Sequence, residues 1–183
     1  AAIDYPVLVK PNDERSSKGI RDNPVAGDPA AAEARCRWLW ERYGCAALVE
    51  EFLPGVEVTV GLAGNGAGAH VLGMMEIGAA EAGAPFVYSL EVKRDWRRCV
   101  RYHVPPRLDA PTLRALHDSA LAAWRCLGCR DISRMDFRLD AAGRPSFIEC
   151  NPLAGLNPVS GDIVLLSAPT LPYASLVQNV LRD

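Results

Sequence analysis

The stretch ISRMDFRLDAAGRPSFIECN, residues Ile132 to Asn151, predicts a β-hairpin. Two runs rich in apolar and aromatic residues flank DAAGR, which has the small and polar residues typical of a turn. Successive side chains of a strand point to opposite faces of its sheet. The first run therefore separates an apolar face from a charged face. The apolar face holds Ser133, Met135, Phe137 and Leu139, and the charged face holds Arg134, Asp136 and Arg138.

The returning strand adds polar groups to the charged face. Its period of two places Phe147, Glu149 and Asn151 together. If the turn is centred on Ala141 to Gly143, Arg134 lies opposite or diagonal to Glu149, with Asp136 as a near neighbour. Two carboxylates about 4 Å apart repel by about 4 kcal/mol at an effective dielectric constant of 20. A positive group is therefore expected between them.

Two groups can supply this positive charge. Arg134 can form an internal salt bridge with the carboxylates, which is a purely structural arrangement. A bound cation is the alternative, and Asn151 favours it. An amide oxygen adds nothing to an arginine bridge, whereas it is a normal ligand for Mg²⁺. Because Mg²⁺ commonly binds together with phosphates, the hairpin raises the question of a nucleotide site.

Composition and charge limit the classes of partner that the chain is expected to bind. The chain has 183 residues, of which 49% are hydrophobic, and a net charge of -2, so we expect one globular domain or two small lobes. The chain has no long run of like charge, so binding to nucleic acid or to a membrane surface is not expected. No apolar run approaches a membrane span, and the first residues lack the pattern of a signal peptide, so a cytoplasmic protein is expected. The start without Met suggests that an upstream portion is missing.

The remaining pattern predicts an α+β fold with antiparallel sheets. A buried strand in YPVLVKP ends near Lys10, and a helix spans Ala30 to Tyr43, with Asp28 as N-cap and Gly44 as its end. Further strands are expected in VEVTVGLA and AHVLGMMEI, a second long helix after Asp109, and a last helix in LPYASLVQNVL. Strands and helices do not alternate strictly, which argues against a parallel sheet.

Two short motifs have ordinary structural explanations beside functional ones. GNGAG, Gly64 to Gly68, resembles part of a dinucleotide fingerprint, but it lies between two strands and fits a tight hairpin turn better. CLGC, Cys126 to Cys129, is either half of a zinc or redox site, or a helix end with Gly128 after the last turn. The second interpretation is preferred because no complementary ligand pair follows. All six cysteines are expected to be reduced.

Phosphate groups would need a site other than a P-loop, because the chain has no such motif. Lys10 lies at a strand end and is followed by RSSKG, which offers hydroxyl and backbone N–H groups. Lys93 offers a second cation. Either lysine alone is more typical of a solvated surface position.

Five stretches together resemble D-alanine–D-alanine ligase and its ATP-grasp relatives in order and approximate spacing. They are YPVLVKPNDERSSKGI, ALVEEFLPGVEVTV, YSLEVKRDW, CRDISRMDFRL and SFIECNPLAGLNPVS. The resemblance covers nearly the whole chain and implies two small α+β lobes with antiparallel sheets that sandwich ATP. It assigns residues 1–51 to part of the small lobe, with the phosphate loop and hinge strand, and residues 52–183 to the large lobe, with the metal-binding hairpin and the C-terminal helix.

The resemblance also implies a set of ATP-binding residues. Lys10 and Lys93 would hold the phosphates, and the loop with Ser16 and Ser17 would fold over them. The strand exit would hold the adenine: Glu50 would face its exocyclic amine, with Glu51 beside it, and the backbone of Phe52 and Leu53 would line the ring. Glu57 would bond the ribose.

The same resemblance assigns the metal and substrate residues. Asp136, Glu149 and Asn151 match the ligands of Mg²⁺, with Mn²⁺ as an alternative. Arg134 and the backbone N–H of Gly155 would stabilise the tetrahedral intermediate. Ser160 and Gly161 would receive the carboxylate of the second amino acid.

The implied activity is ATP-dependent ligation of a carboxylate to an amine through an acylphosphate, with D-alanine as substrate, in peptidoglycan precursor synthesis. Ligation of another amino acid or small carboxylate, or nucleotide binding without turnover, are the alternatives. The chain departs from the family pattern at Arg15, Arg94 and Gly161, which affects the expected substrate more than ATP binding. The family's N-terminal domain would complete the site, and the full-length protein is expected to be a homodimer.

Overall fold

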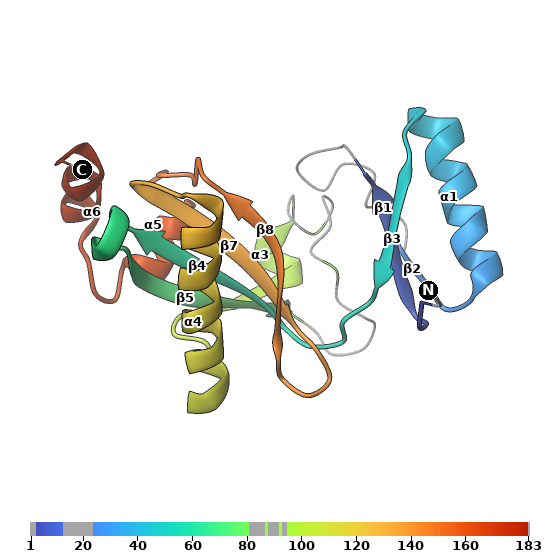
Figure 1. Ribbon diagram of the computed structural model, residues 1–183, viewed down its shortest axis with the longest axis horizontal. Helices are drawn as coiled ribbons and strands as arrows, with labels where there is room; N and C mark the ends of the chain where they lie inside the picture. Colours follow the sequence, from blue (N-terminus) through green and yellow to red (C-terminus); the bar gives the residue numbers. More distant parts are fainter. Residues whose placement is uncertain (1–2, 13–23, 81–86, 88–91, 93–94, 183) are drawn as a thin grey trace. The chain divides into compact units, whose positions relative to one another are not determined.

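The computed structural model describes residues 3–12, 24–80, 87, 92 and 95–182 (Figure 1). The chain divides into two compact units. The first comprises Ala1–Leu53 and Ala79–Arg101, and the second comprises Pro54–Gly78 and Tyr102–Asp183. The assignment of residues 1–51 and 52–183 to the two lobes of an ATP-grasp fold stays a prediction.

The first unit is built on a three-stranded antiparallel sheet in the order β2-β1-β3. Its strands are β1 (Val7–Pro11), β2 (Val25–Ala26) and β3 (Ala47–Glu51), and helix α1 (Pro29–Tyr43) covers one face. The buried cluster between them consists of Val7, Val9, Ala26, Ala32 and Leu39. Because β1 alternates, Leu8 and Lys10 project from the face away from α1.

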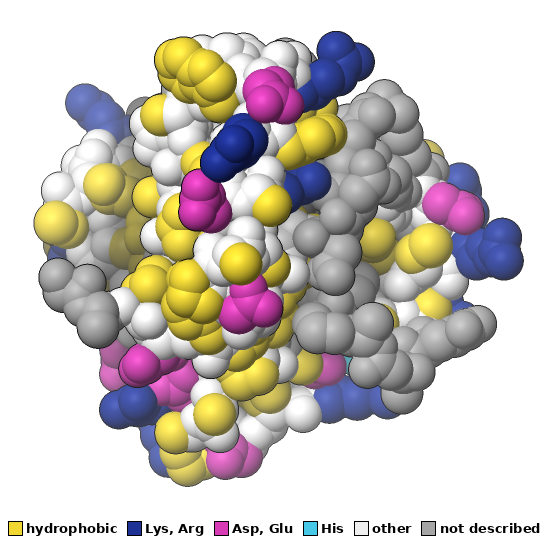
Figure 2. All heavy atoms as spheres, turned by 90° about the vertical axis from the view of Figure 1, so that its right-hand side faces the viewer, with side chains coloured by type: hydrophobic (Ala, Val, Ile, Leu, Met, Phe, Trp, Pro, Cys, Tyr) yellow, Lys and Arg dark blue, Asp and Glu magenta, His cyan; other side chains and the backbone are white. Residues whose placement is uncertain are grey.

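Helix α1 begins and ends where its sequence predicts. The Asp28 side chain accepts a hydrogen bond from the backbone N–H of Ala31 at 2.8 Å, and Pro29 occupies the first turn. Gly44 ends the helix in the left-handed region with φ of 65°, and its N–H donates to the Trp40 carbonyl. Charged and apolar side chains are interspersed in the view of Figure 2.

A five-stranded sheet organises the second unit, in the order β6-β5-β4-β7-β8. Its strands are β4 (Glu57–Ala63), β5 (His70–Ala79), β6 (Val100–His103), β7 (Ile132–Leu139) and β8 (Pro145–Asn151). Strand β4 is antiparallel to β5 and β7, and β7 is antiparallel to β8. The short helix α3 (Trp96–Cys99) precedes β6. The predicted α+β class with antiparallel sheets is confirmed.

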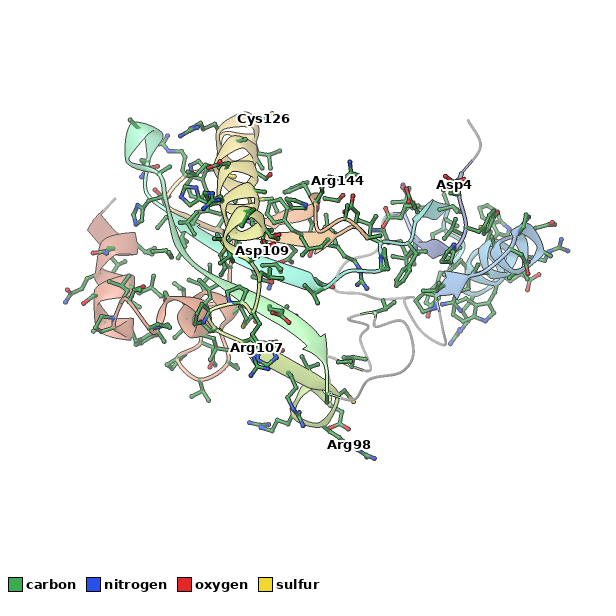
Figure 3. The ribbon with its side chains drawn as sticks, turned by 90° about the horizontal axis from the view of Figure 1, so that it is seen from below. Asp4, Arg98, Arg107, Asp109, Cys126 and Arg144 are labelled. Carbon is green, nitrogen blue, oxygen red and sulfur yellow. The ribbon has the colours of Figure 1, made fainter. Side chains whose placement is uncertain are left out.

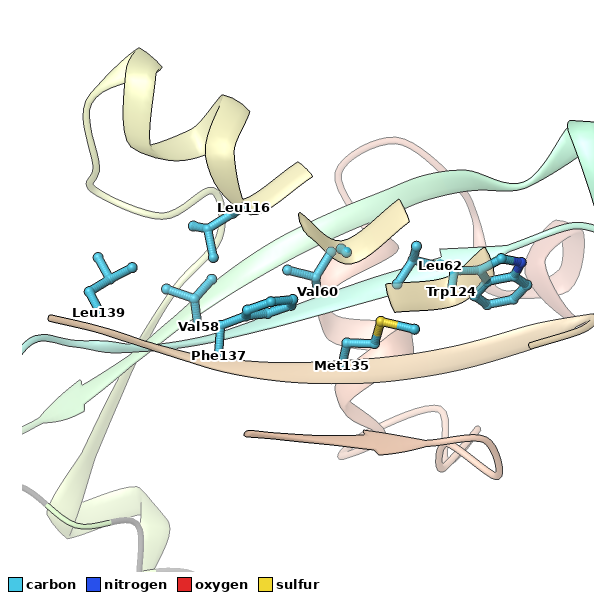
Figure 4. Close-up of a cluster of buried hydrophobic side chains, with 9 residues drawn as sticks. Val58, Val60, Leu62, Leu116, Trp124, Met135, Phe137 and Leu139 are labelled. Carbon is cyan, nitrogen blue, oxygen red and sulfur yellow. The ribbon is translucent and has the colours of Figure 1, made fainter. Parts of the chain in front are cut away.

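Helix α4 (Ala110–Leu127) packs on one face of this sheet (Figure 4). Asp109 caps it by accepting from the Thr112 N–H at 2.8 Å, and Gly128 ends it with φ of 64°, as predicted. The core between α4 and the sheet consists of Val58, Val60, Leu62, Leu116, Ala120, Trp124, Met135, Phe137 and Leu139. The apolar residues of β7 are therefore the ones that face α4.

Helices α5 (Asp162–Ser167) and α6 (Tyr173–Arg182) follow the sheet. Gly61 of β4 and Gly73 of β5 allow α5 to approach closely, because a Cβ atom at either position would run into Leu166. Gly61 pairs with Arg134, which faces away from α4, so α5 packs on the face opposite α4. Helix α6 confirms the predicted terminal helix, whereas α5 was not expected.

The connection from β4 to β5 is a turn, as expected from GNGAG, but not a two-residue hairpin. Strand pairing stops at Ala63 and His70, and a short 3₁₀ turn, Gly66–Gly68, lies between them. The Asn65 side chain donates to the Asp131 carboxylate at 2.9 Å, which fixes this wider turn. None of the helices in the described ranges carries an apolar stretch that could span a bilayer.

The hairpin of β7 and β8 differs from its prediction at one position. Met135 pairs with Cys150 and Asp136 with Glu149, but the register then shifts and Phe137 pairs with Phe147. The extra residue puts Phe147 on the face of Phe137, with the two ring centroids 5.7 Å apart in an edge-to-face contact. The prediction that Phe147 shares a face with Glu149 and Asn151 is therefore wrong.

Candidate functional site

Charged and polar side chains gather on the sheet face away from α4, in the second unit. The strand registers place Thr59 beside Asp136, Asp136 opposite Glu149, and Arg134 opposite Asn151. We call this group the polar face. It consists of Glu57 and Thr59 from β4, Arg134, Asp136 and Arg138 from β7, and Glu149 and Asn151 from β8. The predicted meeting of two carboxylates and an amide beside an arginine is present.

Asp136 is the most buried carboxylate of the polar face, with 6% of the residue exposed. Its Oδ1 accepts from the Thr59 hydroxyl at 2.9 Å, and its Oδ2 accepts from Arg134 Nη2 at 2.8 Å. Burial raises the pKa of Asp136, although Arg134 and the Thr59 hydroxyl act in the opposite direction. The buried negative charge is therefore only partly compensated by its neighbours.

Arg134 lies among three carboxylates. Its Nη1 donates to the Asp162 carboxylate, its Nη2 donates to Asp136, and Glu149 Oε1 lies 3.8 Å from Nη2. Burial alone would lower the pKa of Arg134, but the carboxylates, Asp136 foremost, raise it above its ordinary value. The internal salt bridge expected from the sequence is thus formed, and Asp162 was not anticipated as part of it.

Carboxylates outnumber guanidinium groups around the polar face among the described residues. The carboxylates belong to Glu57, Asp136, Glu149 and Asp162, and the guanidinium groups to Arg134 and Arg138. Glu57 Oε2 and Arg138 Nη1 are 3.8 Å apart, and burial lowers the pKa of Arg138 in spite of Glu57. A group of carboxylate oxygens suits a divalent cation.

The side chains at this place suit Mg²⁺. Asp136 and Glu149 are directly opposed, so their Cβ atoms are expected about 4.5–5.5 Å apart. The Glu149 side chain is 62% exposed and can turn toward a ligand. The Asn151 amide oxygen accepts only a 3.2 Å bond from the Leu153 N–H, which leaves a lone pair. All three donors are oxygens, the ligand type that Mg²⁺ prefers.

Asn151 is essential to this interpretation. Within residues 3–12, 24–80, 87, 92 and 95–182, no three His, Cys, Asp or Glu side chains are arranged to hold a metal ion. The third protein oxygen beside the carboxylates of Asp136 and Glu149 is therefore the amide oxygen of Asn151. The CLGC motif does not supply a competing metal site among these residues.

The loop after β8 brings the expected substrate residues next to one another. Asn157 organises it: the N–H groups of Val159 and Ser160 donate to its side-chain oxygen at 2.9 and 3.0 Å, and the Gly161 N–H donates to its carbonyl at 2.9 Å. A Cβ atom on Gly161 would run into the backbone of Gly155 and Asn157. This close approach leaves no room for a side chain at position 161.

In the first unit, two residues expected to bind ATP form an ion pair. The Lys10 ammonium lies 2.6 Å from the Glu50 carboxylate on the neighbouring strand. Glu51 is exposed at the end of β3, and the Phe52 N–H donates to the Pro6 carbonyl at 3.0 Å, ahead of Leu53. Ser16, Ser17 and Lys93, with Arg15 and Arg94, lie outside the described residues.

Sequence reasoning missed two members of the site. Thr59 could have been found, because it alternates with buried valines and falls on the same strand face as Glu57. Asp162 had a weaker signal, an acidic residue before the short apolar run IVLL, which is typical of a helix start. Its contact with Arg134 depends on how α5 packs, and the local sequence does not contain that information.

The comparisons with known proteins identify the family and the fold. The family described as D-ala D-ala ligase C-terminus matches residues 1–182. The D-alanine–D-alanine ligase of Albidiferax ferrireducens is 34% identical over 183 residues, which covers 100% of this chain and 50% of that protein. The chain spans about half the length of the curated relatives it matches.

Solved structures share the fold. The VanG D-Ala:D-Ser ligase from Enterococcus faecalis has a TM-score of 0.75 at 21% identity, covering 97% of this chain and 49% of its own. The D-alanine–D-alanine ligase from Bacillus anthracis complexed with ATP has a TM-score of 0.69 at 18% identity, covering 97% and 52%. The chain belongs to the D-ala D-ala ligase C-terminus family and has its α+β, ATP-grasp fold.

Proposed function

We propose that the protein is an ATP-dependent carboxylate–amine ligase of the D-alanine–D-alanine ligase type, acting in the cytoplasm on peptidoglycan precursors. The carrying observation is the polar face, where Asp136, Glu149 and Asn151 offer three oxygen ligands beside Arg134. A structural salt bridge alone does not need the amide. Family membership supplies the reaction class.

We propose for the nucleotide the residues that the resemblance assigns to it. Lys10 would exchange Glu50 for a phosphate, because a triphosphate offers it more negative charge than one carboxylate. Glu50 would then be released toward the adenine amine, with Glu51 and the backbone of Phe52 and Leu53 nearby. Ser16, Ser17 and Lys93 are proposed for the phosphates and Glu57 for the ribose, on the resemblance alone.

Asp136, Glu149 and Asn151 are proposed to hold Mg²⁺, or Mn²⁺, against the phosphates. Bound Mg-ATP supplies the phosphoryl group that activates the first carboxylate as an acylphosphate. Arg134 is suited to the developing oxyanion because Asp162 fixes one side of its guanidinium independently of Asp136. The exposed Gly155 offers a backbone N–H as the second donor.

The second substrate is proposed to lie at Ser160 and Gly161. This loop is held by backbone contacts and by Asn157, and Gly161 has no side chain with which to select an amino acid. D-Alanine is the first candidate for both positions. The relative named a D-Ala:D-Ser ligase makes another small amino acid the second candidate. The further domain and the homodimer expected from the resemblance stay predictions.

The test is replacement of the carboxylates in the purified protein. Asp136→Asn and Glu149→Gln should each lower Mg²⁺-dependent ADP release with D-alanine by about 100-fold or more, because several kcal/mol of charge stabilisation are lost. Asp118→Asn, an exposed carboxylate on α4, is the matched control and should keep its turnover. Thermal melts of all variants report whether they are folded.

Near-normal turnover in both folded variants would contradict the metal assignment. A lowered melting temperature without a specific loss of turnover would instead support a salt bridge with only a structural role.

Lys10 allows a separate test of the nucleotide site. Lys10→Met should weaken ATP binding by about tenfold while leaving adenosine binding unchanged, because only the phosphates lose a charge-assisted hydrogen bond. Calorimetric titration of both ligands measures the difference, and Arg37→Met on the exposed side of α1 is the control. Equal weakening of ATP and adenosine would contradict a phosphate contact.

A further inference from the structure

We propose that Cys129 and Cys150 are a disulfide-forming pair, a site of reversible modification by low-molecular-weight disulfides such as glutathione disulfide. Their Sγ atoms lie 3.7 Å apart. Cys129 follows Gly128 at the end of α4, and Cys150 lies on β8 opposite Met135, on the face that α4 covers. The pair thus joins two elements far apart in the sequence.

The position of the two sulfur atoms allows a disulfide to form after a small movement. A disulfide bond is about 2.05 Å long, so the sulfur atoms must approach by about 1.7 Å from van der Waals contact. Backbone bonding fixes both starting positions: the Cys129 N–H donates to the Trp124 carbonyl at 3.0 Å, and Cys150 is held in the β7–β8 ladder. Strand β8 is the last strand of its sheet and carries the register shift next to this position, which permits a small displacement.

The structure changes the meaning of the CLGC motif. The sequence pairs Cys126 with Cys129, as in a redox or zinc motif, whereas in the structure the Cys129 sulfur contacts that of Cys150. Cys126 is exposed in the last turn of α4, at the end of the helix away from Asp109 (Figure 3). It therefore provides an internal control, a thiol close in sequence that lacks the geometry of the pair.

The reaction is two thiol–disulfide exchanges. One cysteine thiolate of the pair attacks glutathione disulfide, breaks its S–S bond and releases one glutathione as a thiol. The second cysteine then attacks the mixed disulfide and releases the other glutathione. The protein loses two electrons and two protons, both glutathione molecules gain them as thiols, and one S–S bond replaces another.

A consequence for activity rests on the proposed function. Cys150 lies between Glu149 and Asn151 in β8, with its side chain on the other face of the sheet. Closing the bond draws β8 toward the end of α4 and shifts the backbone that carries both proposed metal ligands. Oxidation should therefore lower Mg²⁺-dependent turnover by about tenfold or more, as displacement of metal-ligand support does elsewhere.

The pair is tested by chemistry that needs no activity. The purified folded protein is incubated with glutathione disulfide, free thiols are alkylated, and peptides are mapped by mass spectrometry without reduction. A Cys129–Cys150 cross-link is expected in wild type and in Cys126→Ser. It should be absent in Cys129→Ser. Only mixed disulfides with glutathione, or a Cys126–Cys129 cross-link in place of the expected one, would overturn the pair.

Turnover measured on the same samples separates the two proposals. Oxidised wild type should lose turnover and regain it with dithiothreitol, while oxidised Cys129→Ser keeps it. Full turnover in cross-linked wild type would overturn the effect on the metal ligands. Absence of ligase turnover in the fully reduced protein would instead count against the proposed function, and it would leave the mapped cross-link as evidence for the pair.

Discussion

The two faces of the five-stranded sheet are built from the same strands, but one is apolar and packs beneath helix α4, whereas the other carries charged side chains. On β7, Met135 and Phe137 are at most 1% exposed beneath α4, while Arg134 and Asp136 alternate with them on the other face. The apolar face is completed by helix α4 of the same chain. The polar face has three carboxylates and two guanidinium groups among the described residues. Neighbouring residues of one strand would therefore serve stability and the proposed ligand binding separately.

The largest effect on stability should come from the apolar face. Phe137→Ala removes a fully buried ring and should lower the free energy of unfolding by about 3–5 kcal/mol. The neighbouring Asp136→Asn should cost much less, because Asn can still accept a hydrogen bond from Thr59. Urea denaturation of both variants measures the contrast.

Phe147→Ala is the matched control for this comparison. Its ring is 45% exposed and contacts Phe137 edge to face, so its loss should be smaller than that of Phe137. If Asp136→Asn destabilised the protein as much as Phe137→Ala, the polar face would be a structural element and the separation of roles would fail.

The alternation that separates the faces could be predicted from the sequence, and so could the caps of the long helices. Asp28, Gly44, Asp109 and Gly128 act locally, through hydrogen bonds and backbone angles within one turn of the chain. The register shift beside Phe147 could not be predicted, because the residue pattern continues evenly through it. An extra residue in one strand is decided by how the paired strands fit.

The candidate site was predictable to the same extent. The sequence predicts that Asp136, Glu149 and Asn151 lie on one hairpin, but not how they pair. The pairs nearer the turn would put Asp136 opposite Ile148, and the register shift brings it opposite Glu149. Asp162 reaches Arg134 only because Gly61 and Gly73 let α5 approach the sheet. Such a contact joins residues from separate elements and leaves little trace in the local sequence.

A smaller effect should follow from the hydroxyl that supports Asp136. Thr59→Val keeps the side-chain shape and removes the bond to Oδ1, which should cost about 1 kcal/mol at pH 7. Burial already raises the pKa of Asp136, and this loss raises it further. The cost should therefore be present at pH 7, where the carboxylate must be charged, and should fall toward pH 3, where it is protonated in both the folded and unfolded states.

Urea denaturation at pH 7 and pH 3 measures this dependence. Thr59→Val in the Asp136→Asn background is the control and should cost less than in wild type, because no charge remains to be stabilised. An equal cost in both backgrounds would show that the hydroxyl matters for packing and not for the carboxylate.

The smallest effect should come from Asp140, an aspartate of the same hairpin with the opposite pKa shift. Its carboxylate accepts hydrogen bonds from the backbone N–H groups of Ala142 and Arg144 at 2.8 and 2.9 Å, and from Arg144 Nε at 2.7 Å. The hydrogen bond from the Arg144 N–H is the main cause that lowers the pKa of Asp140, and the hydrogen bonds together outweigh the effect of desolvation.

A lowered pKa in the folded state means that Asp140 stabilises the protein above about pH 3.8, its ordinary value, and loses this contribution as the pH falls through the lowered pKa. Asp140→Asn should therefore unfold slightly more easily than wild type at pH 7, and urea denaturation should show that the difference vanishes in strong acid. Hydrogen bonds within the turn would then stabilise the charged form of Asp140, whereas burial disfavours the charged form of Asp136 on the polar face. A cost for Asp140→Asn that grew in acid would contradict this difference.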